Sequence, residues 1–268
     1  MLNTNEQERR KNASKDLAIK LSFELALYKV LRPLFMGYSK EFVKKYSALA
    51  LFPNIESFNA TMRKTLVEHY KAVARKFSRR AVDELGVPEN HSAVLDRIGN
   101  ITDTHHSVRA AQSADIISDT TQKDLLGAIQ KTKTDALQTG EILSKEDLAR
   151  RASLEFDKKS LGRLNIISAT ETQNPAEHAK QTEVESLAHH DAIVQGVNLK
   201  TATKQKQWLA VLDNVTREAH AEADGQMVEF DMPYIVNGQS LMFPGDMSLG
   251  ATIDNTINCR CSSIIIVR

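Results

Sequence analysis

The stretch from Trp208 to Asp246, WLAVLDNVTREAHAEADGQMVEFDMPYIVNGQSLMFPGD, decides the fold class, because its pattern differs from the chain before it. The apolar run 208–212 predicts a strand, and residues 216–223 predict a short helix. Residues 227–231 alternate apolar and polar side chains, as a half-buried strand does. Asn237-Gly238 then predicts a hairpin between residues 234–236 and 240–243. With a buried strand at 263–267, residues 197–268 are expected to form a small α+β domain with a short antiparallel sheet.

The chain before this domain is typical of helices. We expect helices at 17–31, 39–51 and 55–85, within a helical region 1–88. Residues 17–31 carry apolar side chains on every side, which predicts a helix that is buried either in the chain's own core or against a partner. Pro33 and Gly37 are expected to end it. The third helix has one apolar stripe and is closed by Gly86-Val87-Pro88.

A second, polar helical region is expected over 89–196. It is rich in Ser, Thr, Asp and Gln, but apolar residues such as Ile116, Leu125 and Ile129 keep weak helical spacing, which favours helices over a disordered linker. Ser144 followed by Asp147 is a helix start signal. We expect that helix to break near 161–163 and to resume from Ile166 towards His190.

Composition excludes several classes of protein. The chain has 268 residues, 35 Lys and Arg against 34 Asp and Glu, and 41% hydrophobic residues, which excludes a disordered chain, a collagen and a membrane-embedded protein. Residues 17–31 are too short and too charged to span a membrane. Residues 1–15 contain no apolar core of a secretory signal, and two cysteines fit a reducing compartment. We therefore expect a soluble protein made inside the cell.

The charge is distributed unevenly along the chain. Residues 1–110 hold 19 basic and 12 acidic residues, a net of +7, whereas residues 111–268 hold 16 and 22, a net of −6. The densest basic segment supplies the candidate nucleic-acid-binding residues Arg63, Lys64, Lys71, Arg75, Lys76, Arg79 and Arg80. Such a segment fits phosphate contacts without sequence preference, and the competing interpretation is a solvated helix face.

Six short motifs follow one another in the last hundred residues. They are Thr170-Glu-Thr172, Trp208-Leu-Ala-Val-Leu-Asp213, Thr216-Arg-Glu-Ala-His220, Asp224-Gly-Gln226, Phe243-Pro-Gly-Asp246 and Ile257-Asn-Cys-Arg-Cys261. In this order the series resembles the C-terminal domain of phage minor head proteins similar to the F protein of bacteriophage Mu, also called the head-morphogenesis family. The resemblance covers residues 165–268. The family motif residues are Glu171, Trp208, Asp213, Arg217, His220, Asp224, Gly225, Pro244, Gly245, Asp246, Asn258, Cys259 and Cys261.

The resemblance implies a virion protein that acts in head morphogenesis and is not an enzyme. Its expected partners are the phage portal protein and the capsid, with packaged double-stranded DNA as a further, non-specific one. The expected location is the head interior or portal vertex, after synthesis in the host cytoplasm, with a role in genome delivery. Physically, the motif residues are mainly structural: Trp208 is expected to be buried with its N–H bonded to backbone, and Asp213 and Asp224 to accept backbone N–H groups.

The residues His220, Cys259 and Cys261 are the candidate metal ligands. Thiolate and imidazole suit Zn²⁺, but a structural site needs four ligands, and only Asp224 or His190 could supply the fourth. Some relatives carry Cys-x-x-Cys where this chain has Arg217-Glu-Ala-His220, so one thiol is missing. A disulfide between residues two apart would be strained. The alternatives are therefore a zinc site and, as the main expectation, no cofactor, with buried thiols beside a hydrogen-bonded histidine.

The alternative function is a metal-dependent nuclease-like or toxin-like enzyme that uses His220 with Cys259 and Cys261. No dense carboxylate cluster accompanies this histidine. The pairs His105-His106 and His189-His190 lie in polar helical sequence and are expected at the surface. The sequence contains no P-loop, no Gly-x-Ser-x-Gly and no dinucleotide-binding fingerprint.

The region 1–60 is predicted to be an assembly arm. Apolar surface left over on residues 17–31 would dock on the portal or on another copy of the chain. Removing residues 1–31 should then abolish incorporation into capsids while the C-terminal domain stays folded.

Overall fold

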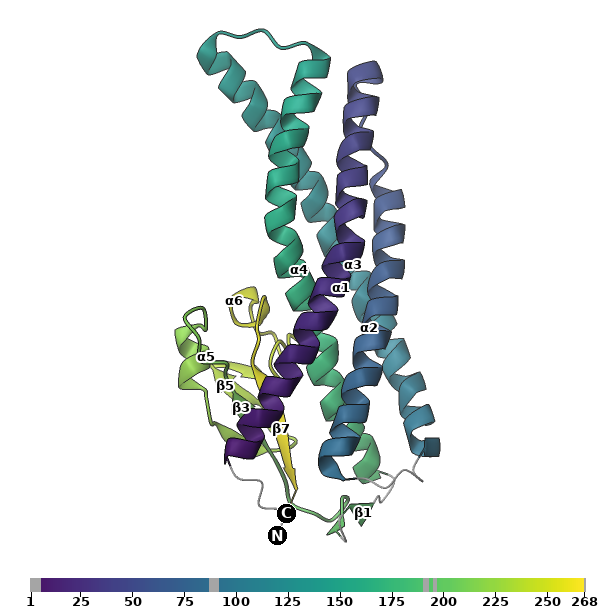
Figure 1. The fold of residues 1–268 in the computed structure, drawn as a ribbon, viewed down its shortest axis with the longest axis vertical. Coiled ribbons are helices and arrows are strands. Elements are labelled where there is room, and N and C mark those ends of the chain that lie inside the picture. The colour runs from purple at the N-terminus through teal and green to yellow at the C-terminus, as the bar shows by residue number, and fades with distance from the viewer. Residues whose placement is uncertain (1–5, 87–91, 190–192, 195–196, 268) are drawn as a thin grey trace. The chain divides into compact units, whose positions relative to one another are not determined.

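Four long helices and several short strands make up the structure, a computed structural model that describes residues 6–86, 92–189, 193–194 and 197–267 (Figure 1). The long helices are α1 (Glu6–Leu49), α2 (Ile55–Leu85), α3 (Ser92–Thr139) and α4 (Lys145–His189). The strands and short helices are β1 (Ile193–Val194), β2 (Val197–Asn198), β3 (Lys204–Leu209), α5 (Glu218–Glu222), β4 (Met227–Glu229), β5 (Tyr234–Val236), β6 (Gln239–Leu241), α6 (Ile253–Thr256) and β7 (Ser262–Val267). The predicted α+β class is confirmed. None of the helices within these ranges is long and apolar enough to cross a membrane.

The chain divides into two compact units. Unit 1 consists of Met1–Glu24, His69–Ser107 and Ala169–Arg268, and unit 2 of Leu25–Glu68 and Val108–Ser168. Each long helix therefore contributes one segment to each unit. The units are built from separated stretches of the chain, whereas the sequence pattern predicted three consecutive regions, 1–88, 89–196 and 197–268.

The first two predicted helices are one continuous helix. Pro33 lies inside α1, and the helix also passes through Gly37. On either side of the proline, Leu31 and Phe35 are fully buried. Burial of apolar side chains on both sides outweighs the lost backbone hydrogen bond, so the expected helix end at this point was wrong.

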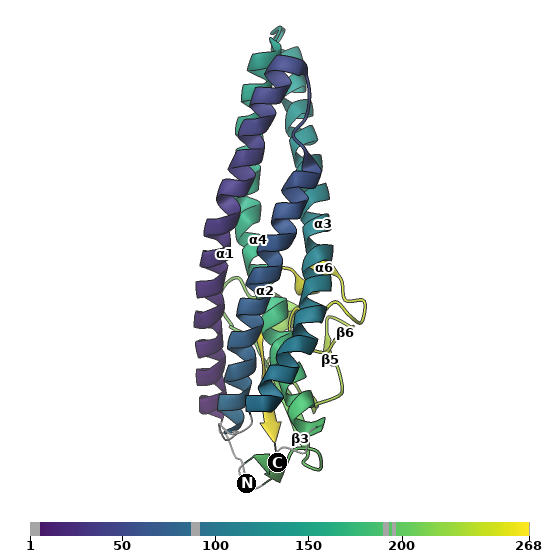
Figure 2. The ribbon, with the colours of Figure 1, turned by 90° about the vertical axis from the view of Figure 1, so that its right-hand side faces the viewer.

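Helix α1 is buried on one face rather than on every side. Leu27 is 2% exposed, but Leu21, Leu25 and Val30 are 48%, 55% and 56% exposed. Within the chain, the predicted burial is therefore found on one face only, and the other face keeps the left-over apolar side chains from which docking on a partner was predicted. In unit 2, α1 lies beside α2, where the rings of Phe35 and Phe58 make an edge-to-face contact with centroids 5.2 Å apart (Figure 2).

Helix α4 begins where the sequence predicted and continues where a break was expected. The Asp147 amide donates to the Ser144 hydroxyl oxygen over 3.0 Å, which confirms the start signal. The helix then runs through residues 161–163 without interruption. Ser160 and Leu164 on either side are fully buried, so packing holds this segment helical. The end of α2 at Leu85, before Gly86 with φ 70°, is also as predicted; Val87 and Pro88 lie outside the described residues.

The strands of unit 1 form small antiparallel sheets in the orders β4-β3-β7 and β5-β6, with β1 paired to β2. The predicted hairpin is confirmed, since Asn237 and Gly238 have φ of 51° and 70° between β5 and β6. The strand predicted at 208–212 instead occupies 204–209, and Leu212 has a φ of 60°. Lys206 is 1% exposed and donates to the Met242 carbonyl over 2.7 Å, which allows this polar segment to lie inside.

Candidate functional site

The motifs that are far apart in the sequence meet in unit 1, where α4 contacts two C-terminal loops. The Thr170 hydroxyl oxygen accepts a hydrogen bond from the Asn258 amide over 3.0 Å. The Gln173 side chain donates to the carbonyls of Pro244 and Cys261 over 3.2 and 2.8 Å. These bonds join three of the six motifs into one structural unit.

Gly245 is required by this contact for two reasons. Its φ is 87°, a conformation that L side chains rarely adopt, and an added Cβ would lie 3.0 Å from Cγ of Gln173. The Asn174 side chain also donates to the Gly245 carbonyl over 3.1 Å. The neighbouring Asp246 carboxylate accepts the Met242 amide over 2.9 Å and fixes the same loop. On the other side of α4, Glu171 accepts a hydrogen bond from the Tyr70 hydroxyl.

Asp213 links the turn before α5 to the segment that carries the cysteines. Its carboxylate accepts hydrogen bonds from Arg260 over 2.7 Å, from Thr216 over 2.9 Å and from the Val215 amide over 3.2 Å. These bonds, that from Arg260 above all, lower the pKa of Asp213 to about 2. Arg217 donates to the Ile257 carbonyl over 2.5 Å. This bond is a second tether between the start of α5 and the segment that carries the cysteines.

Both carboxylate oxygens of Asp224 accept hydrogen bonds, which makes Asp224 a poor candidate for a metal ligand. One carboxylate oxygen accepts the Ala210 amide over 2.9 Å, and the other accepts Arg10 over 2.7 Å. The backbone bonds predicted for Asp213 and Asp224 are therefore confirmed. Gly225, with a φ of 81°, donates its amide to the Trp208 carbonyl over 2.8 Å. The other candidate fourth ligand, His190, lies outside the described residues.

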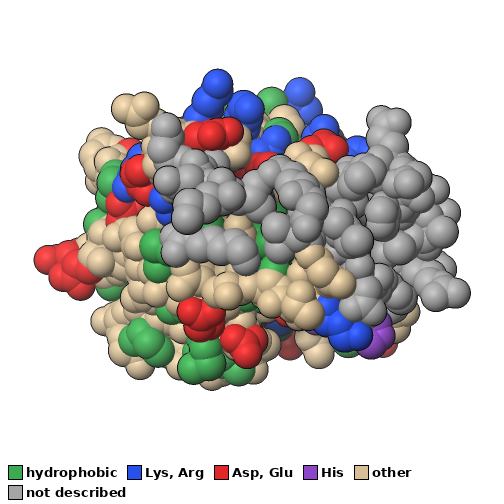
Figure 3. Space-filling view, turned by 90° about the horizontal axis from the view of Figure 1, so that it is seen from below, with side chains coloured by type: hydrophobic (Ala, Val, Ile, Leu, Met, Phe, Trp, Pro, Cys, Tyr) green, Lys and Arg blue, Asp and Glu red, His purple; other side chains and the backbone are tan. Residues whose placement is uncertain are grey.

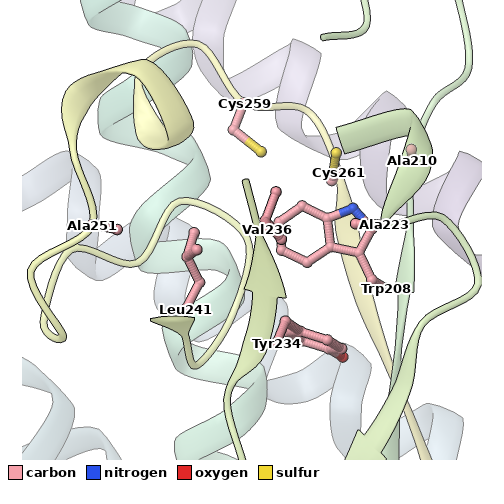
Figure 4. Close-up of a cluster of buried hydrophobic side chains, with 9 residues drawn as sticks. All are labelled: Trp208, Ala210, Ala223, Tyr234, Val236, Leu241, Ala251, Cys259 and Cys261. Carbon is pink, nitrogen blue, oxygen red and sulfur yellow. The ribbon is translucent and has the colours of Figure 1, made fainter. Parts of the chain in front are cut away.

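Trp208 is fully buried in the core of the small domain, but its N–H is not bonded as predicted. No acceptor lies within hydrogen-bond distance of the indole nitrogen among the described residues. The ring makes edge-to-face contacts with His220 and Tyr234, at centroid distances of 5.5 and 5.3 Å, and this aromatic packing replaces the expected carbonyl. Figure 4 shows Cys259 and Cys261 on one side of the ring and Tyr234 on the other.

The three candidate metal ligands converge. His220 lies on α5, and Cys259 and Cys261 lie in the segment between α6 and β7. His220 Nδ1 is 3.7 Å from Cys259 Sγ and 3.4 Å from Cys261 Sγ, and all three ligand atoms lie within 4.8 Å of one another. The exposed fractions are 2%, 2% and 3%. The structure thus brings together the three residues that the sequence singled out.

The two thiols share one environment but differ in acidity. Neither cysteine forms a disulfide. Hydrogen bonding from Cys261, with a further contribution from His220, lowers the pKa of Cys259 well below its ordinary value. The same bond to Cys259, together with burial, raises the pKa of Cys261 well above its ordinary value. The pair therefore favours one thiolate and one thiol.

A buried ionic network, not predicted from the sequence, lies next to this site. Lys20 is 2.5 Å from Glu177, and Lys180 is 2.8 Å from Asp16 and 3.1 Å from Glu177. All four residues are 2% exposed or less. Lys20 also donates to the Cys261 carbonyl over 3.1 Å, so the network fixes the segment that carries the thiols. The sequence signal that could have indicated this network is a lysine, Lys20, inside the apolar stretch 17–31.

The basic residues of α2 differ in their surroundings. Arg80 pairs with Asp16 and Glu84, and Arg63 pairs with Asp115 over 2.6 Å. Lys71 is partly buried, while Lys64, Arg75, Lys76 and Arg79 are exposed. Arg63 and Lys64 belong to unit 2, and the other five to unit 1. Figure 3 shows Lys and Arg side chains gathered along one edge of the face seen from below, with acidic side chains among them.

The histidine pairs do not all lie at the surface. His106 is fully buried, which corrects the prediction for the pair His105-His106. His105 is exposed and stacks on His178 of α4, with ring centroids 4.0 Å apart. His106, next along the helix, makes edge-to-face contacts with the rings of Tyr70 and His178, at centroid distances of 6.0 and 5.4 Å, and this packing holds it inside. His189 is exposed as predicted.

We expect buried histidines to make unit 1 less stable in acid. Burial lowers the pKa of His178 to about 3 and that of His69 to about 4. Between those values and about 6.5 the unfolded chain binds protons that the folded chain does not, so stability falls as pH falls, by about 1.4 kcal/mol per pH unit for each histidine. Urea unfolding at several pH values would show a shallower dependence for His178→Gln than for the wild type. Equal slopes would contradict this prediction.

Comparison with known proteins agrees with the motif-based interpretation. The family described as Phage Mu protein F like protein matches residues 127–264, so the match begins earlier than the motifs do. A curated relative, the NAD(+)--arginine ADP-ribosyltransferase EFV of Enterococcus faecalis (strain ATCC 700802 / V583), is 23% identical over 179 residues, 66% of this chain and 32% of that protein. The chain spans about a third of the length of that relative. No solved structure gives a significant match. Since the family match covers more than half of the chain, this protein belongs to the family of proteins like the F protein of phage Mu.

Proposed function

We propose that this protein is a minor head protein of a bacteriophage, located in the virion, that acts in head morphogenesis at the portal vertex. Membership of the Mu F-like family supports the role in the phage head. A structural role is supported by one observation: the motif residues make contacts inside the protein. Asp213, Asp224 and Asp246 each bind backbone amides, and Gln173 joins two motif loops.

The site itself supports a non-catalytic role. His220 is 2% exposed and lies between two buried thiols, so a phosphodiester could not reach it without rearrangement of the domain. The nuclease-like alternative is therefore disfavoured. The similarity to the ADP-ribosyltransferase covers a third of that protein, and a transferase activity of this chain forms no part of the proposal.

We propose that the exposed apolar side chains of α1 dock on the portal protein. Leu21 and Leu25 are four residues apart, on one face of the helix, and each is about half exposed. Contiguous exposed apolar surface marks interaction sites, and the two leucines would form part of such a surface.

The test is co-purification with portal rings from cells that produce both proteins. The wild type is expected to elute with the rings. The variant Leu21→Glu/Leu25→Glu is expected to bind the rings at least about tenfold more weakly, which corresponds to a loss of about 1.4 kcal/mol of binding free energy. Leu126→Glu is the matched control, because Leu126 is 48% exposed on another helix, α3. Elution of the folded wild type apart from the rings would contradict the proposed function. Equal association of the double variant would contradict only the docking surface.

We further propose a non-specific contact between α2 and packaged DNA that assists genome delivery. Lys76 and Arg79 are exposed and lie three residues apart in the densest basic segment. Each phosphate contact contributes about 0.9 to the slope of log affinity against log salt, so Lys76→Gln/Arg79→Gln should lower that slope by about 1 to 2. Filter binding at several salt concentrations measures it. Lys133→Gln/Lys158→Gln, also exposed, is the control that should leave the slope unchanged. Absence of wild-type DNA retention at about 50 mM salt would contradict the contact.

A further inference from the structure

We propose that His220, Cys259 and Cys261 bind one Zn²⁺ ion, with a water molecule as the fourth ligand. The donor set is one imidazole nitrogen and two sulfurs, and these soft ligands are those that Zn²⁺ takes in proteins. The proposal does not depend on the role in the phage head, because it rests only on this cluster and the cavity next to it.

The spacing of the donor atoms fits a tetrahedral ion. With Zn–S of about 2.3 Å and Zn–N of about 2.0–2.1 Å, a tetrahedral angle places sulfur and nitrogen about 3.5–3.6 Å apart. The observed distances from His220 Nδ1 to the sulfurs of Cys259 and Cys261 are 3.7 and 3.4 Å. Both distances lie within about 0.2 Å of the separation expected between sulfur and nitrogen around a tetrahedral ion. The ligands would thus need little movement to bind the ion.

The charge of the site also favours an ion. Two thiolates, one neutral imidazole and Zn²⁺ sum to zero, which suits a group of side chains that are 2–3% exposed. On binding, the proton of the remaining thiol is released to solvent, and both sulfurs bond to the metal as thiolates. The ion would join α5 to the segment before β7, which Arg217 and Asp213 already link through hydrogen bonds.

The fourth position fits a water molecule. A cavity of about 20 Å³ adjoins the cluster, and its walls include Thr216, Arg217 and Asn258 besides the three ligands. A water molecule needs roughly 10–15 Å³ and polar neighbours, and these side chains provide them. Asp224 is held by Arg10 and the Ala210 amide, which leaves it unsuited to the fourth position. Within the described residues, no fourth His, Cys, Asp or Glu joins the group.

The experiment measures metal in the full chain, purified in reducing buffer without chelator. We expect about one zinc per chain by elemental analysis, and a folded apo form after chelation that takes up about one Co²⁺. The cobalt form should show the absorption bands of tetrahedral thiolate coordination. Cys259→Ser, Cys261→Ser and His220→Gln should each lose the metal, whereas Asp224→Asn should retain it.

The variants are read together with a measurement on the wild type, because a buried substitution could prevent folding. Chelation should lower the wild-type Tm, and equimolar Zn²⁺ should restore it. A folded, reduced wild type that contains no zinc and gives no cobalt spectrum would overturn the proposal. Retention of the metal by a folded Cys259→Ser variant would overturn the ligand set, and loss of the metal from folded Asp224→Asn would overturn water as the fourth ligand.

Discussion

Replacing Lys180 by methionine is expected to lower the free energy of unfolding by about 3–5 kcal/mol, the cost of removing one partner from a buried ion pair. Lys180 donates to Asp16 over 2.8 Å and to the Ser263 carbonyl over 2.9 Å. Burial lowers the pKa of Lys180, but Asp16 and Glu177 outweigh it and the net shift is upward, so the ammonium stays charged. Methionine would leave both carboxylates facing a neutral side chain inside the protein.

Urea unfolding followed by circular dichroism measures the effect. Lys131→Met is the matched control, because Lys131 pairs with Glu155 over 2.5 Å while both side chains are more than 40% exposed. An exposed pair contributes about 0–1 kcal/mol, so this variant should unfold near the wild type. Asp16→Asn/Lys180→Met should recover part of the loss, since it removes opposite charges together. Equal stability of Lys180→Met and Lys131→Met would show that the network is not stabilising.

Deleting residues 1–31 is expected to prevent the C-terminal domain from folding, contrary to the prediction made from the sequence. The deletion removes Asp16 and Lys20, which leaves Lys180 and Glu177 without their partners on α1. It also removes Ile19 and Phe23, which pack on the core of unit 1. Lost pairs of this kind cost about 3–5 kcal/mol each, and whole domains are stable by only about 5–15 kcal/mol.

Limited proteolysis and thermal unfolding of the truncated chain provide the measurement. We expect rapid cleavage within residues 197–268 and no cooperative transition. A synthetic peptide of residues 6–31, added in excess, should restore protection if the lost contacts are the cause. A truncated chain that unfolds cooperatively at the wild-type Tm would refute this prediction. Failure of the truncation to enter capsids would not identify an assembly arm, which is why the leucine substitutions on α1 test docking instead.

The position of the proposed zinc ion gives it a structural consequence. Lys20 and Gln173 both donate to the Cys261 carbonyl, over 3.1 and 2.8 Å. An ion bound to the Cys261 sulfur would therefore hold the segment before β7 at the point where α1 and α4 already contact it.

The sequence by itself determined the features that depend on neighbouring residues. Asn237-Gly238 specified the hairpin because both positions take positive φ, and Ser144 specified the start of α4 because its hydroxyl accepts the Asp147 amide. The order of the motifs identified the family, and the residue types within them indicated His220, Cys259 and Cys261 as candidate metal ligands. Such signals are readable because their physical cause lies within a few residues.

Only the tertiary structure decided the features whose partners are distant in the chain. Pro33 does not end α1, because buried side chains on both sides hold the helix. Lys206 lies inside a strand, because the Met242 carbonyl accepts its ammonium group. Lys20 and Glu177, 157 residues apart, form a buried pair that neither local sequence predicts. The free energy of burying a charge is set by the partner that meets it, and that partner is known only once the chain has folded.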